Sequence, residues 1–383
     1  MKPGRGARAA LLTSHCAGML DMVTLPLWMG SLVAWYGFDP QRAGLLATLF
    51  LGGQVASSLY FAPRFGRFPP RQAATIGFLI AGLAFLGISN THAYGPMALL
   101  HLAGGVGAGC ALSMTHGTIG SSDNPHRLFA QAGLALGVFS IVTLGAGPKF
   151  IAAAGGSAMF LAFAGITAVA AVVAALAFPS PLTIRPEVNG ARLRLSTQVW
   201  FAMVGMGLVS LANTTVFSFV ERIGIDRGYG VDAVSAAFVV TGLVNLLPPV
   251  LATLLQKRVP AERVVLFGPL VQAALLLALT QVDAFAIYAP AAALMIAAVV
   301  FIHTFLFGLL ARLDPSGRAV AATPAMLMIG SATGPLLGGT RVQLSGYRAL
   351  GLAGASVAIL AALCFSRVQS AGTSLAPQPE IDH

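Results

Sequence analysis

Residues 18–33 read GMLDMVTLPLWMGSLV, an apolar run that holds a single charged side chain, Asp21. The run lies inside a longer apolar segment over residues 10–36. A transmembrane helix needs about 20 predominantly apolar residues, so this segment is long enough to cross a lipid bilayer. A carboxyl near the middle of such a helix is costly to insert, and intramembrane acids therefore usually serve a function.

The rest of the chain has the same character. Of its 383 residues, 57% are hydrophobic and 9% are charged, and the mean hydropathy is +0.83. Soluble globular domains carry roughly 25% charged residues, so this composition indicates a membrane protein with several spans. The apolar segments are also too long to be strands of a β-barrel, which alternate over about ten residues.

Twelve segments are predicted to be transmembrane helices of an all-α polytopic membrane protein. They are residues 10–36, 43–62, 72–90, 95–118, 128–150, 155–178, 198–221, 231–254, 263–282, 285–311, 319–341 and 346–366. A polar stretch rich in proline and arginine separates the sixth from the seventh. We therefore expect an N-terminal six-helix bundle (1–178), a cytoplasmic linker (179–197), a C-terminal six-helix bundle (198–369) and a disordered tail (370–383).

The basic residues predict the orientation. Sixteen of the 22 lysines and arginines flank the spans on the side that holds both termini. Because cytoplasmic loops carry an excess of Lys and Arg, both termini are predicted to be cytoplasmic. We expect a multi-pass protein of the inner (plasma) membrane. The net charge of +10 is explained by these loops, so no nucleic-acid partner is predicted.

Corresponding motifs recur in the two halves. The Gly-x-Asp sequence at 37–39 recurs at 224–226, and the Gly-Pro sequence at 147–148 recurs at 334–335, in both cases 187 residues later. Motifs that return in the same order indicate an internal duplication. The two bundles are therefore expected to be pseudo-symmetric, an arrangement that transporters use to place a substrate path between two repeats.

Three motifs in this chain resemble those of the major facilitator superfamily. The loop PRFGR (63–67) is similar to the family's Asp-Arg-x-Gly-Arg core, with a proline at the acidic position. The stretch GSATGPLLGG (330–339) fits the family pattern Gly-x-x-x-Gly-Pro-x-x-Gly-Gly. The stretch HLAGGVGAG (101–109) is similar to a drug-antiporter pattern, with His101 at the position of an arginine.

The resemblance implies a twelve-helix fold and secondary active transport by alternating access. It also implies a conformational role for the residues of the loop and of the two Gly-Pro motifs. These are Arg64, Gly66, Arg67, Gly147, Pro148, Gly334 and Pro335.

Asp21 and His101 are the candidates for proton coupling. Asp21 is the one acid that lies deep in a predicted span, whereas Glu221 is expected to be hydrated near the outer end of the seventh. His101 carries a group that titrates near neutral pH. We hypothesise that the two face each other and exchange a proton. The alternatives are a structural Asp21 bonded to a neighbouring helix and a neutral His101 bonded to a backbone carbonyl.

Polar and aromatic side chains within the spans are candidates for solute binding, although each could instead form a bond between helices. They are Thr24, Trp28, Gln54, Asn213, Phe217, Asn245 and His303. No lysine or arginine lies at the middle of a span, so a strongly anionic solute would lack a counter-charge. The predicted solute is a neutral or cationic organic molecule.

Together these features predict a secondary active transporter that performs proton-coupled efflux, with Asp21 as the protonation site. Proton-coupled uptake of a small metabolite and a non-transporting receptor on the same fold remain alternatives. The spans hold no cluster of titratable or metal-binding groups at one depth, so no enzyme activity is predicted. The expected partners are the solute, protons and the lipid bilayer, with no cofactor or metal, and the expected state is a monomer.

Overall fold

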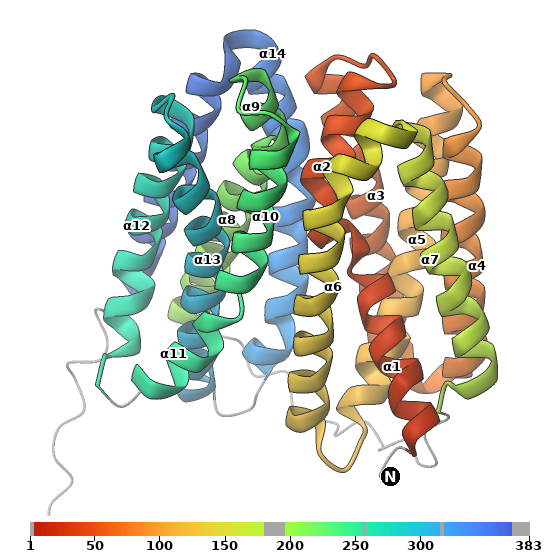
Figure 1. Cartoon of the computed structure of the whole chain (residues 1–383). Coiled ribbons are helices and arrows are strands. Elements are labelled where there is room, and N and C mark those ends of the chain that lie inside the picture. The colour runs from red at the N-terminus through yellow and green to blue at the C-terminus, as the bar shows by residue number, and fades with distance from the viewer. Residues whose placement is uncertain (1–3, 180–195, 256–257, 315–317, 370–383) are drawn as a thin grey trace, which may run out of the picture.

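The structure, a computed structural model, describes residues 4–179, 196–255, 258–314 and 318–369. Within these ranges the chain forms α-helices, one 3₁₀ helix and no strand (Figure 1). The all-α prediction is therefore confirmed. Most of the predicted linker and all of the predicted tail (370–383) lie outside the described residues.

The helices follow the predicted apolar segments closely. Those of the first half are α1 (Arg5–Gly18), α2 (Leu20–Ala34), α3 (Pro40–Phe61), the 3₁₀ helix η1 (Ala62–Arg67), α4 (Pro70–Ser89), α5 (Tyr94–Gly120), α6 (Pro125–Ala154) and α7 (Gly156–Ala177). Those of the second half are α8 (Thr197–Phe217), α9 (Val220–Asp226), α10 (Val231–Val244), α11 (Leu247–Leu255), α12 (Ala261–Gln281), α13 (Phe285–Leu313) and α14 (Arg318–Gln369).

The helices account for twelve membrane crossings. Ten described segments are long and apolar enough to span a bilayer. One of them, Met326–Val368, contains two crossings because the backbone of α14 turns back at Gly346, where φ is 73°. Helices α10 and α11 together supply the remaining crossing. The protein is thus a multi-pass membrane protein with the predicted number of spans.

The first span of each half is broken, which the apolar pattern did not predict. Helix α1 ends at Gly18 and α2 begins at Leu20, so the expected continuous helix over residues 10–36 is interrupted at Met19. In the second half, α8 ends at Phe217 and α9 begins at Val220. A break frees backbone carbonyls from helical hydrogen bonds, and other groups then satisfy them.

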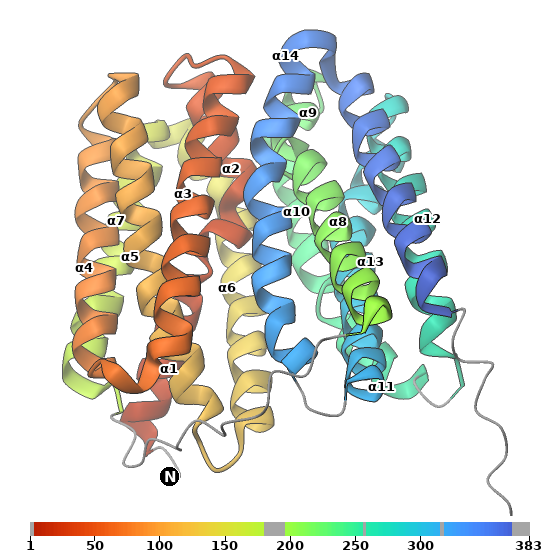
Figure 2. The ribbon, with the colours of Figure 1, turned by 180° about the vertical axis from the view of Figure 1, so that it is seen from behind.

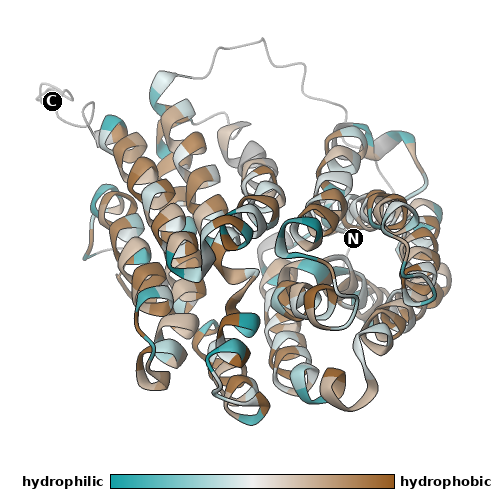
Figure 3. Cartoon of the chain, turned by 90° about the horizontal axis from the view of Figure 1, so that it is seen from above, coloured by the Kyte–Doolittle hydropathy of each residue, from teal (hydrophilic) through white to brown (hydrophobic). Residues whose placement is uncertain are grey.

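The helices form two groups that lie side by side. Figure 1 shows α1 to α7 on one side and α8 to α14 on the other, and the two groups are also distinct in Figure 3, viewed along the helices. The largest cluster of buried apolar side chains includes Trp28 and Phe160 from the first group and Val216 and Phe238 from the second. The two groups therefore share one continuous core.

Contacts between the groups are concentrated toward one end. Helix α1 begins and α14 finishes at the same end of the bundle, which we call the near end; the opposite end is the far end (Figure 2). Helix α3 packs against the first part of α14, α6 against α10, and α2 against α9. Figure 2 shows α3 and the first part of α14 converging at the far end and diverging toward the near end.

Candidate functional site

Asp21 lies at the break between α1 and α2. Its side chain is 2% exposed, and its Oδ1 accepts a hydrogen bond of 3.2 Å from Gln54 Nε2 on α3. The same Gln54 nitrogen donates to the carbonyl oxygen of Gly18, which the helix break leaves free. Asp21 Oδ2 is buried, and none of the described residues gives it a hydrogen-bond partner. The carboxyl is therefore held in place by one oxygen, and the other is available for a proton.

The glycines of α5 bring Gln54 to this position. A Cβ atom on Gly109 would overlap the carbonyl oxygen of Gln54, and one on Gly105 would overlap the carbonyl of Phe50. Only residues without a side chain allow two helices to approach so closely. The glycine-rich stretch after His101 thus sets the distance between α5 and α3.

His101 is 0% exposed and bonds to two groups other than Asp21. Its Nδ1 lies 2.8 Å from the carbonyl oxygen of Met97, and its Nε2 lies 3.1 Å from Trp28 Nε1. Since a carbonyl only accepts and an indole N–H only donates, Nδ1 carries the hydrogen and the ring is neutral. Both ring nitrogens are used, so the hypothesised contact with Asp21 is not made in this structure. The bonding matches the alternative of a neutral histidine on a backbone carbonyl.

Trp28 is placed inside the first half. Its ring is 1% exposed and is surrounded by Phe50, Phe85, Phe160 and Phe163 at centroid distances between 4.9 and 5.6 Å. Thr24, also proposed to bind solute, donates its hydroxyl hydrogen to the carbonyl of Leu20 on its own helix. In this conformation both side chains pack the bundle.

We predict that His101→Leu lowers the free energy of unfolding of the protein. The transport rate of the folded variant should change little. The substitution leaves the buried indole N–H of Trp28 without an acceptor, which costs about 1–3 kcal/mol in the free energy of unfolding. Denaturant unfolding of the purified protein in detergent measures this loss. In a double-mutant cycle with Trp28→Phe, the two effects should not add. Loss of transport at unchanged stability would contradict a packing role.

Asn213 and Phe217 are the candidates on α8, and both are mostly buried. Asn213 Oδ1 is buried without a hydrogen-bond partner among the described residues. One turn away, the Ser210 hydroxyl donates to the carbonyl of Leu327, and Ser331 Oγ lies 2.7 Å from Ser210 Oγ. Polar side chains of α8 thus tie it to α14 and leave the Asn213 oxygen available.

The last two candidates, Asn245 and His303, bond to none of the other candidate residues that the structure describes. Asn245 follows the last residue of α10 at the bend toward α11, and its Oδ1 is buried without a partner within the described ranges. The ring of His303 on α13 packs against the ring of Phe307, with the two ring centres 4.2 Å apart. Its buried Nε2 also has no hydrogen-bond partner within these ranges. The structure therefore brings together two candidate pairs, Asp21 with Gln54 and Trp28 with His101.

The Gly-Pro motif of α14 packs against both halves at once. A Cβ on Gly334 would overlap Thr214 Oγ1 on α8, within the second half. The carbonyl of Pro335 faces Gly44 on α3, across the boundary between the halves. The backbone N–H of Leu336 also donates to Thr48 Oγ1 on α3, at 3.2 Å. This motif thus joins the two halves at the far end.

The other motif residues have more local contacts. Gly147 packs against Leu27 of α2, and the neighbouring Pro148 lies inside α6. Arg64 donates to the carbonyl of Tyr60, and its guanidinium lies 4.4 Å from the centre of that residue's ring. Gly66 and Arg67 complete the 3₁₀ helix η1. In this conformation Arg64 therefore bonds within its own half.

Two further contacts join the halves at the far end. Lys149 on α6 pairs with Asp232 on α10, with Nζ and Oδ1 2.7 Å apart. Glu221 on α9 packs so closely on Gly30 of α2 that a Cβ on the glycine would overlap its carboxyl. The far end is thus closed by polar as well as apolar contacts.

The carboxyl of Glu221 is buried, in contrast to the hydrated side chain that its position in the sequence predicts. Its Oε2 is buried and has no hydrogen-bond partner among the described residues, so the expectation of a hydrated side chain is wrong. Arg222, next to it, pairs instead with Asp226 at 2.6 Å on the more exposed face of α9. That i, i+4 pair was a readable signal, because it turns Glu221 toward the neighbouring face.

Replacing Glu221 by methionine is expected to stabilise the protein and to slow transport. The unpaired carboxylate oxygen is removed from water at the contact with Gly30, which costs about 1–3 kcal/mol in the free energy of unfolding. An apolar side chain of similar length avoids this cost. A firmer closure of the far end would hinder its opening. Thermal unfolding in detergent measures the first effect and flux in proteoliposomes the second. The prediction would be contradicted if Glu221→Met were less stable than the wild type while Glu221→Gln were equally stable. That result would show that the Glu221 side chain forms a stabilising hydrogen bond.

A pair of histidines in the near-end part of the first half was also missed. His15 Nδ1 on α1 and His116 Nε2 on α5 are 3.1 Å apart, and Phe129 of α6 lies beside the second ring. The pair is not part of a metal site of three or more His, Cys, Asp or Glu ligands, since the described residues contain no such group. The signal in the sequence was the position of His15, six residues before Asp21 in the same span.

Comparison with known families identifies the chain. The family model of the Major Facilitator Superfamily matches residues 10–316. The chain belongs to the major facilitator superfamily. A search of curated proteins found no significant match.

Solved structures of the superfamily share the fold. A bacterial homologue of the human lysosomal transporter Spinster, in an inward-facing and unoccupied conformation, superposes with a TM-score of 0.76 at 12% identity, covering 96% of this chain and 97% of that chain. A point mutant of the nucleoside transporter NupG superposes with a TM-score of 0.75 at 13% identity, covering 95% of this chain and 100% of that chain. At 12–13% identity, these likenesses show that this chain has the same fold as those transporters.

Proposed function

We propose that this superfamily transporter moves a small organic solute out of the cell by alternating access, driven by protons that bind Asp21. The observation that carries the proposal is the buried Asp21 carboxyl, with one oxygen bonded to Gln54 and the other unpaired among the described residues. An acid that bonds through one oxygen can gain and lose a proton without losing its position. Its protonation state then changes with the side to which it is exposed.

The arrangement of the halves supports the alternating-access part of the proposal. The contacts at Gly44, Gly30 and Lys149 all lie toward the far end. With both termini in the cytoplasm, as the distribution of Lys and Arg predicts, the far end faces outward. The halves would then be closed to the outside, and rocking them about these contacts would expose the other side.

The solute is proposed to be neutral or cationic. Within the described ranges, three amide or carboxyl oxygens of candidate residues lie buried without a partner: Asn213 Oδ1, Asn245 Oδ1 and Asp21 Oδ2, which accepts hydrogen bonds while the carboxyl is ionised. Such oxygens attract hydrogen-bond donors and positive charge and disfavour anions. Working as a monomer in the inner membrane, the protein would need no cofactor.

Proton-linked flux in proteoliposomes tests the function directly. The purified protein is reconstituted with the pH dye pyranine enclosed, and cationic and neutral aromatic solutes are added from one side. Efflux coupling predicts that a solute moving in one direction drives protons in the other. Proton and solute movement in the same direction would favour uptake, and solute binding without any flux would favour a receptor.

A further inference from the structure

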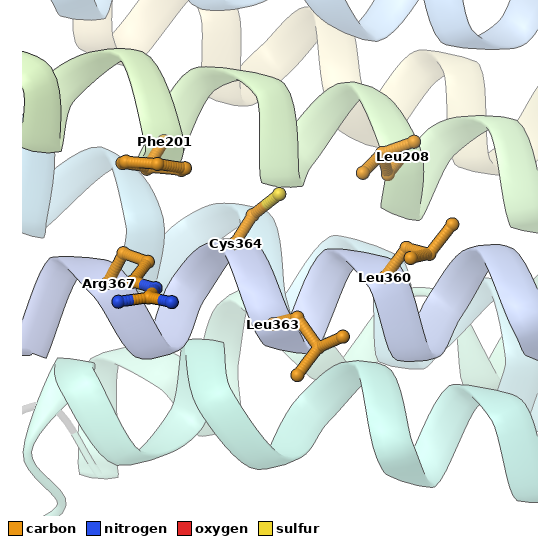
Figure 4. Close-up of a pocket in the computed structure, with 6 residues that line it drawn as sticks. All are labelled: Phe201, Leu208, Leu360, Leu363, Cys364 and Arg367. Carbon is orange, nitrogen blue, oxygen red and sulfur yellow. The ribbon is translucent and has the colours of Figure 1, made fainter.

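The second half contains a crevice between two of its helices. It lies between α8 and the last part of α14 and has a volume of about 480 Å³. Its lining residues are Phe201, Leu208, Leu360, Leu363, Cys364 and Arg367 (Figure 4). In Figure 4 Phe201 and Leu208 face the crevice from α8, and Cys364 reaches between them from α14.

Apart from Arg367, the crevice is lined by apolar side chains and the Cys364 thiol, and its two helices are in direct contact beside it. Phe365 is 0% exposed and packs against Gly205 of α8, where an added Cβ would lie 2.7 Å from the ring. This contact joins α8 and α14 next to the crevice. Leu360 and Leu363, at the rim, are 51% and 58% exposed. In a membrane protein, such side chains meet lipid chains.

The charge of the crevice is at its near end. Arg367 lies two residues before the end of α14, and no described residue forms an ion pair or a hydrogen bond with its side chain. The distance from Leu360 to Arg367 along the helix is about 10 Å at 1.5 Å per residue. One leaflet of the hydrocarbon core is about 15 Å thick, so the crevice fits within one leaflet with Arg367 toward its headgroups.

We propose that this crevice binds one anionic glycerophospholipid of the near-end leaflet. One acyl chain occupies the space between Phe201, Leu208 and Cys364, and the phosphate lies at the Arg367 guanidinium. The apolar lining suits an acyl chain, and an unpaired guanidinium suits a phosphate, which it binds through two parallel N–H groups. The crevice has no acid in its lining, so nothing in it opposes a negative headgroup.

The test measures phosphatidylglycerol retained by the purified protein. Protein in detergent is delipidated in steps, incubated with phosphatidylglycerol or phosphatidylcholine, and analysed by native mass spectrometry. Arg367→Gln is expected to weaken phosphatidylglycerol binding about fivefold, the equivalent of about 1 kcal/mol per basic residue near anionic lipid, and to leave phosphatidylcholine unaffected. Cys364→Trp, which fills the crevice, is expected to abolish the retained lipid of either kind.

Two matched variants serve as controls. Arg258→Gln removes an exposed arginine elsewhere in the second half, and Leu352→Trp adds an indole at an exposed position of α14 outside the crevice. Both should bind phosphatidylglycerol as the wild type does. Equal retention in Arg367→Gln would overturn the headgroup assignment, and full retention in Cys364→Trp would overturn the crevice as the acyl-chain site. Thermal unfolding confirms that each variant is folded.

Discussion

Replacing Asp21 by asparagine is expected to reduce proton-driven solute transport to the level of protein-free liposomes. Asparagine has the shape of aspartate, and its side-chain oxygen can still accept the bond from Gln54 Nε2. It cannot bind or release a proton in the physiological range. The variant should therefore keep its fold and lose only the coupling between the proton gradient and the solute.

Two measurements separate this effect from simple damage. Counterflow of labelled solute against unlabelled solute, with no pH gradient, should persist in Asp21→Asn because exchange needs no net proton movement. Thermal unfolding should be close to that of the wild type. Asp39→Asn is the matched control, since Asp39 is a more exposed acid that accepts a bond from the Arg42 backbone N–H. Normal gradient-driven flux in Asp21→Asn would refute the assignment.

A single methyl group at Gly44 or Gly339 is expected to open the far end and slow transport about tenfold, the effect of a shift of about 1.4 kcal/mol between two states. An added Cβ would overlap the carbonyl oxygen of Pro335 in the first case and that of Pro40 in the second. Both neighbours are backbone atoms, which cannot rotate away as a side chain can. Helix α3 and the first part of α14 must therefore separate.

The separation can be followed by chemical labelling. In a background with Cys16, Cys110 and Cys364 replaced by serine, a cysteine at Thr48 lies at the contact and reacts with a membrane-impermeant maleimide only when the contact opens. Gly44→Ala should raise the labelling rate about tenfold. Gly52→Ala on the same helix is the control, because its Cβ would meet no atom within 4 Å. Equal rates in the two variants would show that this contact does not control the far end.

The candidate site was only partly accessible to sequence reasoning. Asp21 is recognisable because a carboxyl is rare in an apolar span. Gln54 is one of several polar side chains in the spans, and its bond to Asp21 is visible only in the structure. His101 and Trp28 were named for separate roles, and the structure bonds them to each other. The position of Glu221 near the end of a span predicts hydration, but it carries no information about the packing of α9 on Gly30.

What the sequence determined by itself is the number and the positions of the membrane-spanning segments. Apolar length predicts a span, because every backbone polar group in lipid must be satisfied within a helix. The hairpin in α14 was predicted for the same reason, since the two apolar segments before and after residues 341–346 are each long enough to cross. Family membership also followed from short motifs in loops and glycine-rich helices.

Only the tertiary structure decided which face of each helix meets which neighbour. In water, an apolar stripe marks the buried face of a helix, but lipid tails are as apolar as leucine, so the stripe disappears. Leu99 and Leu176 are 71% and 76% exposed, while Phe160 and Leu32 are fully buried, and their hydropathy does not distinguish them. The contacts of Glu221 with Gly30 and of Gln54 with Gly109 depend on close approach at these glycines, which is set by the packing of whole helices.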